Sequence, residues 1–358
     1  MRKNTKLFAA ALVALTAIST LSAETSGLRI GSGHTIQDDV YDLNNVITWN
    51  RLKFNNFMGF TSIDSGSHGN LAGAVHIQKN NVLGLAWNGN LWNNNTNGNV
   101  QDNEFTAFYG FDFNKALKLS FYEKTIRDND TNFEEFIGDQ DIYDVKLTFG
   151  MSPSDKVAFS VNGNFNYEDR SAIDDSTKIT KFGIGGSFFY TIKKDSKIDS
   201  KFYLNGNMEF TGTKTETAGV TAEANTSDFN LIPGVEVQYK LSPKFTYGFD
   251  GYVGIGFNGG DQPKDVNLDF QLNNGFSANI TDALLCNMGI NTTLPSITFP
   301  ENGDAHKGSF QNTFYAGFSF DFSEAIRIDA SASITPQNGM SFQELWQQIF
   351  NLSIRVNL

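Results

Sequence analysis

The chain has 358 residues, with 27 Lys and Arg against 39 Asp and Glu, a net charge of −12. An acidic chain without a basic cluster is a poor ligand for phosphate backbones, so we expect no nucleic-acid partner. The single cysteine, Cys286, excludes an intrachain disulfide framework and a cysteine-rich zinc site. Beyond residue 23 there is no long apolar run, which excludes a bundle of membrane-spanning helices.

Residues 1–23 predict a secretory signal peptide. Cations precede an apolar run from Leu7 to Leu21, and the small residues Ser22 and Ala23 follow it, which is the usual order in such leaders. Cleavage after Ser22 and cleavage after Ala23 both fit. The leader holds three cations and no acid, so its removal leaves 24 Lys and Arg against 39 Asp and Glu, a net charge of −15.

Residues 24–50 predict a separate N-terminal segment that contains a short helix. Ile36, Val40, Leu43 and Ile47 recur at helical spacing after Thr35, and this spacing places the four apolar side chains on one face. The remainder of the chain, residues 51–358, has a different period and forms its own domain.

From residue 51 onward, apolar and aromatic side chains recur at every second position. Around Phe165, for example, Val161, Gly163 and Phe165 alternate with Asn162 and Asn164. Strict alternation predicts β-strands with one apolar and one polar face. Such rows occupy residues 105–113, 117–121, 143–151, 157–167, 182–190, 202–210, 229–239, 245–257, 310–322, 326–334 and 350–358.

These rows predict about sixteen strands, with fourteen as the alternative. Fifteen can be counted from Leu71 onward, and the least distinct lie at 266–272 and 284–290. One further strand, at 53–61, is needed before Leu71 for the connections to alternate correctly. Fourteen strands result if two of the less distinct ones merge.

The connections between the strands alternate between short and long. Short turns lie at 79–81, 114–116, 152–156, 193–200, 242–244 and 323–325, and long polar segments lie at 89–103, 126–140, 168–178, 212–226 and 335–347. This alternation is typical of an up-and-down barrel whose turns face one compartment and whose loops face the other. The predicted fold class is therefore all-β, a transmembrane up-and-down antiparallel β-barrel with short periplasmic turns and long extracellular loops.

In these features the chain resembles an outer-membrane β-barrel protein of a diderm bacterium, close in size to the general porins. The resemblance covers most of the chain but is architectural, and it identifies no specific family. Proteins of this kind end in an alternating strand with a terminal aromatic, which serves as an assembly signal. Here the alternation runs from Phe350 to Leu358, and the last residue is Leu rather than an aromatic.

The resemblance implies export by the cleaved signal peptide and location in the bacterial outer membrane. It implies three kinds of partner: outer-membrane lipid, the barrel-assembly machinery acting through the strand from Phe350 to Leu358, and further copies of the chain in a homotrimer. It also leaves two placements for the segment 24–50, as a plug in the barrel mouth or in the periplasm, and we favour the periplasm.

A second argument for a membrane barrel comes from physical chemistry. A closed sheet pairs every backbone N–H and C=O without an open edge, as hydrocarbon requires. Aromatics concentrate near both ends of the predicted strands, for example Phe111 and Phe245 beside turns and Phe105 and Phe257 beside loops, as two membrane interfaces favour. The alternative is that these rings form the dry core of a soluble β-protein.

The polar faces of the strands are predicted to line the lumen. Seven cations oppose seven acids there, so we predict no ion selectivity, and neutral side chains such as Asn205 and Asn207 complete a wettable wall. The pore-lining candidates are Asp112, Lys118, Lys124, Asp144, Lys146, Lys181, Glu209, Glu236, Lys240, Asp250, Asp321, Arg327, Asp329 and Arg355. A barrel of this size leaves an aqueous channel, which predicts passive diffusion of small hydrophilic solutes.

Two other functions stay open, and enzymatic function is not expected. A fatty-acid-channel-like transporter of apolar ligands predicts fourteen strands and an apolar lumen, and a surface adhesin or structural barrel depends on the long loops. The four histidines fit no metal spacing, and we expect no metal and no cofactor. The one G-x-G-x-x-G match, at Gly254, lies in an alternating row with no helix start after it, so it is no phosphate-binding loop.

Overall fold

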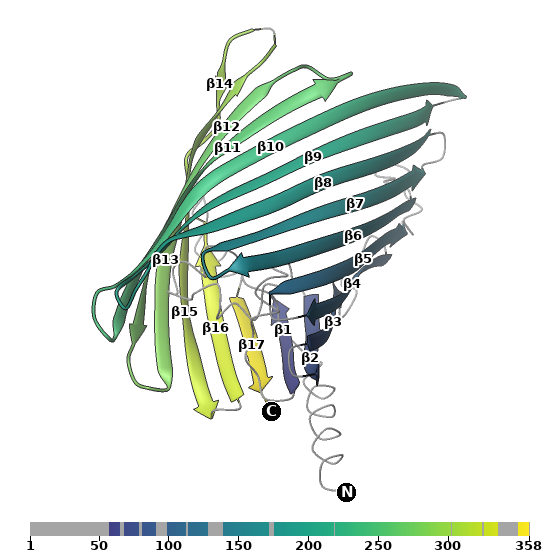
Figure 1. Cartoon of the computed structure of the whole chain (residues 1–358). Helices are drawn as coiled ribbons and strands as arrows, with labels where there is room; N and C mark the ends of the chain where they lie inside the picture. The colour runs from purple at the N-terminus through teal and green to yellow at the C-terminus, as the bar shows by residue number, and fades with distance from the viewer. Residues whose placement is uncertain are drawn as a thin grey trace, which may run out of the picture.

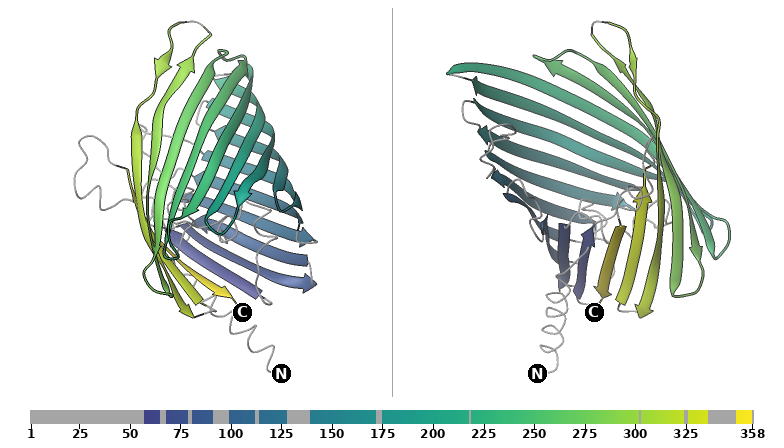
Figure 2. Two further views of the ribbon diagram at one scale, coloured as in Figure 1. Left: turned by 60° about the vertical axis from the view of Figure 1, so that its left-hand side comes forward. Right: turned by 180° about the vertical axis from the view of Figure 1, so that it is seen from behind.

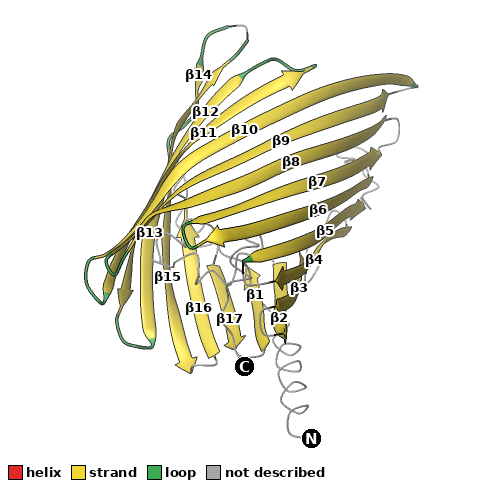
Figure 3. Cartoon of the chain, in the orientation of Figure 1, coloured by secondary structure: helices red, strands yellow, loops and turns green. Residues whose placement is uncertain are grey.

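A computed structural model describes the strands and most turns of the chain. The described residues are 57–64, 68–78, 81–90, 99–111, 114–127, 139–171, 175–217, 219–301, 303–323, 326–335 and 350–357. The predicted signal peptide, the predicted helix of segment 24–50 and Asp112 lie outside these ranges. None of the described residues is helical (Figure 3), and among them no helix is long and apolar enough to span a membrane.

The described residues form seventeen strands in a single sheet (Figure 1). They are β1 Phe57–Asp64, β2 His68–Gln78, β3 Asn81–Asn90, β4 Asn99–Phe111, β5 Lys115–Arg127, β6 Asp139–Ser154, β7 Val157–Ser171, β8 Asp175–Lys194, β9 Ile198–Thr217, β10 Val220–Lys240, β11 Phe245–Gly260, β12 Val266–Asn279, β13 Leu284–Phe299, β14 His306–Lys307, β15 Gln311–Ser323, β16 Ile326–Ile334 and β17 Phe350–Asn357. The two residues of β14 belong to the connection between β13 and β15, so sixteen long strands build the wall.

The sheet closes on itself. Each long strand pairs antiparallel with the next one in the chain, and β13 pairs directly with β15. The first strand, β1, also pairs antiparallel with the last, β17, from Met58↔Asn357 to Asp64↔Asn351. An antiparallel seam requires an even number of strands, and the described wall has sixteen rather than the alternative fourteen. The predicted up-and-down antiparallel barrel is confirmed, and the indistinct strands at 266–272 and 284–290 are β12 and β13.

The barrel wall is strongly uneven in height (Figures 1 and 2). The strands beside the seam, β1 and β17, have 8 residues each, whereas β8 and β9 have 20 and β10 has 21. The long strands therefore rise well beyond the short ones on the side of the barrel opposite the seam.

Two of the predicted long loops are largely strand. The segment 212–226 was expected as a loop, but β9 and β10 pair through it as far as Val220↔Thr217. The segment 168–178 likewise belongs mostly to β7 and β8, which pair up to Ser171↔Ser176. The apolar alternation ends before these segments because both of their faces are polar, while the backbone pairing continues. Alternation therefore predicted where the apolar surface ends, and not where the strands end.

The distribution of polarity is the reverse of that in a soluble protein. On β6, Leu147 is 50% exposed, whereas the next residue, Thr148, is 5% exposed. Among the described residues, the buried set contains six apolar side chains and twelve polar or charged ones. Apolar side chains thus cover the outer face of the wall, and polar side chains pack on its inner face.

Closure of the barrel can be tested with a disulfide across the seam. Residues Ile63 and Leu352 are directly opposed in β1 and β17, and directly opposed Cα atoms lie about 4.5–5.5 Å apart, within the range of a disulfide. We expect Ile63→Cys with Leu352→Cys, in a Cys286→Ser background, to form a covalent ring that migrates faster on a non-reducing gel. Pairing Ile63→Cys with Val356→Cys, four residues farther along, is the control that stays uncrosslinked. An open sheet would leave both pairs reduced.

Candidate functional site

The inner wall of β7 to β13 is organised in rows that run across the strands. Directly opposed residues of antiparallel strands point to the same face of a sheet, so a chain of opposed partners marks one level of the wall. The amide row is the level that contains Asn162, Gly185, Asn207, Asn230, Gly256, Asn267 and Thr298, one from each of these seven strands in order. Four of its seven members are asparagines and none is charged.

Glycines in the amide row provide space for the asparagines beside them. A Cβ at Gly185 would lie 3.1 Å from the amide of Asn162, and a Cβ at Gly256 would lie 2.9 Å from Oδ1 of Asn230. The asparagine side chains therefore lie across the neighbouring strands, over backbone that carries no side chain. At the end of the row, Thr298 donates a hydrogen bond to Oδ1 of Asn267 at 2.7 Å. Asn207 is exposed on this wall.

A second level nearer the short turns carries aromatic rings. This aromatic row contains Ala158, Phe189, Tyr203, Gly234, Tyr252 and Gln271 on β7 to β12. The rings of Phe189 and Tyr203 are 6.4 Å apart between centroids and tilted by 39°. The Tyr203 ring lies against Gly234, because a Cβ there would overlap the ring atoms. The ring consequently lies flat along the wall.

The hydroxyl of Tyr203 is held by an acidic group of the next level. It donates a hydrogen bond to Oδ1 of Asp250 at 2.7 Å, and Asn273 donates to Oδ2 of the same carboxylate at 3.0 Å. Gln271 in turn donates to Oδ1 of Asn273 at 3.2 Å. Asp250 is thus fully engaged between β9 and β12, and it fixes the orientation of the Tyr203 ring.

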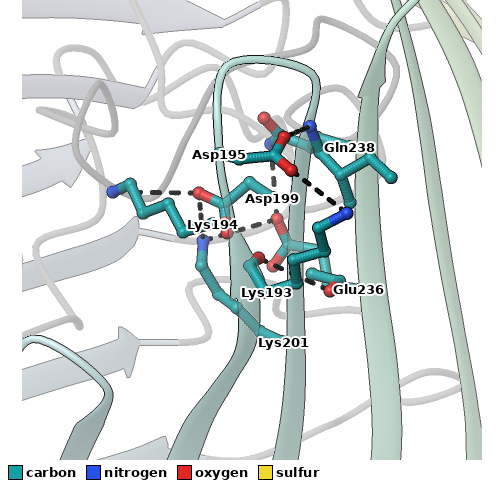
Figure 4. Close-up of polar contacts among 9 residues, drawn as sticks. Lys193, Lys194, Asp195, Asp199, Lys201, Glu236 and Gln238 are labelled. Atoms are coloured by element: carbon teal, nitrogen blue, oxygen red, sulfur yellow. Dashed lines mark hydrogen bonds and ion pairs between the residues drawn. The ribbon is translucent and has the colours of Figure 1, made fainter.

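Charged side chains gather below the aromatic row, beside the turn between β8 and β9 (Figure 4). Lys201 lies 3.9 Å from both Asp199 and Glu236, and Lys194 lies 3.8 Å from Asp199. Gln238 donates a hydrogen bond to Glu236 at 3.3 Å. This turn-side cluster joins β8, β9 and β10 and balances acids with cations, so it presents little net charge to the lumen.

The turn itself is closed by Asp195. Its Oδ1 accepts hydrogen bonds from the backbone N–H groups of Lys197 and Ile198, each at 2.8 Å, and its Oδ2 lies 3.1 Å from Lys193. These backbone hydrogen bonds, with the contribution of Lys193, lower the pKa of Asp195 to about 2. The carboxylate therefore stays ionised over the physiological pH range and keeps the turn tight.

The structure brings several of the predicted pore-lining residues together on the inner face. Lys181 and Glu209 form an ion pair of 3.3 Å between β8 and β9, and Asp321 and Arg327 approach to 3.9 Å between β15 and β16. Glu236 and Asp250 are directly opposed across β10 and β11. The members with described side chains on this face are Lys118, Lys124, Asp144, Lys146, Lys181, Glu209, Glu236, Lys240, Asp250, Asp321 and Arg327.

These residues are not equally placed to meet a solute. Lys118 is only 2% exposed, so neighbouring groups cover it, whereas Lys240 is exposed at the turn end of β10. Asp329 and Arg355 lie in β16 and β17, but their side chains, like the whole of Asp112, lie outside the described residues. That the charged residues line an open pore stays a prediction.

Sequence reasoning missed the aromatic row and part of the amide row. Tyr203, Tyr252 and Asn230 were not named as inner residues, although each alternates with the outward row of its predicted strand. Lys201 was also missed, and it lies one residue before the predicted row that begins at Phe202. Extending the alternation by parity would have placed them on the inner face. Their assembly into levels depends on the register between strands, which the alternation does not determine.

No protein-family model and no curated protein matches the chain. Among solved structures, the chain is similar to a TodX monoaromatic hydrocarbon channel mutant, with 8% identity, a TM-score of 0.41 and 94% of each chain covered. It is also similar to CdiB from Escherichia coli, with 10% identity, a TM-score of 0.49 and coverage of 86% of this chain and 64% of that one. A third similar structure is the β domain of the Bordetella autotransporter BrkA, with 13% identity and a TM-score of 0.36. The match covers 62% of this chain and 92% of that one.

These similarities are too distant to carry an argument about activity. The strand pairing described above establishes the fold independently of them, through the neighbour-to-neighbour order and the seam between β1 and β17. The chain therefore has the architecture of an outer-membrane-type up-and-down antiparallel β-barrel.

Proposed function

We propose that the chain is an outer-membrane channel for passive diffusion of small hydrophilic solutes, exported by the predicted cleaved signal peptide. The observation that carries the proposal is the reversed polarity of the wall. Side chains such as Leu147 and Ile184 are about half exposed on the outer face, whereas the inner face carries amides, hydroxyls and paired charges. A single sheet with an apolar outside and a polar inside fits lipid around it and water within it.

The height of the apolar band supports insertion in a bilayer. On β7 the outward apolar side chains run from Val157 to Tyr167, a span of about 34 Å along the strand at about 3.4 Å per residue. At the usual strand tilt this span corresponds to about 26 Å along the membrane normal, close to the band of known membrane barrels.

The loop-side border of the band is sharp and is marked by aromatics. On β8 the outward residue Phe182 is followed, toward the loop, by Thr180 and Lys178. On β9 the outward residue Phe210 is followed by Gly212 and Lys214. Aromatic rings followed by hydroxyl and charged groups are what a membrane interface followed by water favours. The extensions of β8 to β10 would then stand in water outside the membrane.

A transporter of apolar ligands, similar to the fatty-acid channels, is the alternative we consider less well supported. The described inner wall contains a few rings, among them Phe189, Tyr203 and Tyr252. The neighbouring levels carry Ser160, Ser187 and Asn205 on one side and the Lys201–Glu236 ion pair on the other. Such a wall suits water and polar solutes better than hydrocarbon. The adhesin alternative depends on long loops, several of which lie outside the described residues.

Reconstitution into planar bilayers tests the proposed function. We expect purified, refolded protein to produce stepwise conductance, and we expect sugar-loaded liposomes containing it to swell at rates that fall with increasing sugar size. The matched control is detergent extract from cells that lack the protein. An absence of channel events with correctly folded protein would contradict the proposal and favour a structural or adhesive barrel.

Three parts of the proposal concern partners. Outer-membrane lipid would surround the apolar band, the assembly machinery would recognise the final strand from Phe350 to Leu358, and three copies of the chain would form a homotrimer. The described part of that final strand, β17, forms the seam with β1, so its late pairing would complete the barrel. Crosslinking of the chain in intact membranes would report the trimer.

A further inference from the structure

We propose that the inner wall between the amide row and the aromatic row binds a neutral, hydroxyl-rich solute, namely a short oligosaccharide. The proposal rests on the proposed channel function and specifies its substrate class. Its starting point is that both rows lie on the same strands, β7 to β12, one above the other on the inner face.

The wall between the two rows is also polar and uncharged on β7 to β9. The intermediate level contains Ser160, Ser187 and Asn205, which oppose one another across β7, β8 and β9. Adjacent levels are about 7 Å apart, so the amide and aromatic rows are separated by about 14 Å along the strands. This distance gives room for several linked sugar rings rather than one.

The polar groups of this surface match sugar hydroxyls. A hydroxyl both donates and accepts, and an asparagine amide or a serine hydroxyl offers both functions on one short side chain. Two ion pairs border the surface, Lys181 with Glu209 at 3.3 Å above it and Lys201 with Glu236 at 3.9 Å below it. On β12 the exposed acid Asp269 lies between the two rows, so an anionic solute would be repelled there.

The aromatic row supplies the apolar contact that a sugar ring also needs. One face of the Tyr203 ring rests against Gly234, and its hydroxyl is fixed by Asp250, so the opposite face is directed away from the wall. Phe189 lies beside it, with 6.4 Å between the ring centroids. A rigid aromatic platform beside a wall of amides can hold the C–H face of a sugar ring while its hydroxyls bond to the wall.

The test uses maltotriose as the probe and the ion current through the reconstituted channel as the readout. We expect maltotriose to reduce the current saturably, and we expect gluconate, a charged polyol, to do so only at much higher concentration. Asn207→Ala removes an amide and Phe189→Leu removes a ring while retaining apolar volume. Each is expected to weaken the apparent affinity for maltotriose about fivefold. Asn291→Ala, an inner-wall asparagine of β13 outside both rows, is the matched control that stays within about twofold.

The outcomes separate this inference from the channel function. The inference would be overturned if the channel conducts normally but maltotriose reduces the current without saturation. It would also be overturned if all three substitutions changed the apparent affinity for maltotriose equally. Either result would leave the channel proposal intact. Stronger block by gluconate would also overturn the inference. If no conductance occurs, the channel proposal fails, and equilibrium dialysis of labelled maltotriose against detergent-folded protein decides binding by itself. Weaker binding by Asn207→Ala than by wild type would then support the inference, and equal binding would overturn it. Heat-dependent mobility on gels verifies that each variant is folded.

Discussion

Substitution of Leu147 by arginine is expected to lower the free energy of unfolding in lipid by about 2–4 kcal/mol, the range found for cations at the midplane of membrane barrels. Leu147 lies at the middle of the outward apolar row of β6, which runs from Tyr143 to Met151, and its side chain is 50% exposed. A guanidinium at this position has no water within reach, so it must distort the bilayer or remain poorly solvated. Urea titration of protein folded into vesicles measures the loss.

The matched control for this prediction is Thr180→Arg. Thr180 is also exposed on the outward face, but it lies on the loop side of Phe182, beyond the apolar band of β8. A cation there stands at or above the interface, and we expect a loss of about 0–1 kcal/mol. If both substitutions leave stability unchanged and the Leu147→Arg protein stays folded without detergent, the outer face meets water and the membrane assignment is wrong.

Substitution of Asp250 by leucine is expected to lower the free energy of unfolding by about 1–3 kcal/mol. The carboxylate accepts hydrogen bonds from Tyr203 at 2.7 Å and from Asn273 at 3.0 Å, and Asp250 and Asn273 are both buried. Leucine has a similar size but no acceptor, so both donors lose their partner within the wall. Urea titration of the folded protein also measures this effect.

Asp250→Asn is the control for the Asp250 prediction. It keeps the shape and one acceptor oxygen, and Tyr203 can continue to donate to that oxygen, so we expect it to lose less than half as much stability as Asp250→Leu. Stability of the leucine variant equal to wild type would mean that the Tyr203–Asp250–Asn273 network does not hold the wall. In maltotriose binding, the leucine variant is expected to lose affinity because the Tyr203 ring is no longer fixed.

The alternation of side chains predicted more of the fold than of the candidate site. Residues such as Val161, Gly163 and Phe165 alternate with asparagines strongly enough to identify β7 and both of its faces. The same reasoning predicted about sixteen strands, with fourteen as the alternative, and the alternation of turns and loops. It failed at 212–226, because β9 and β10 continue there with polar side chains on both faces, and a strand surrounded by water leaves no apolar period to detect.

The sequence by itself determined the strands, the identity of the apolar face and the neighbour-to-neighbour order, since each follows from a local period of two and from short turns. Only the tertiary structure decided which residues share a level of the inner wall, such as Asn162 with Asn267 or Tyr203 with Gly234. It also decided that β1 meets β17. Register and closure depend on contacts between segments far apart in the chain, and a period of two is the same in every register that differs by two residues.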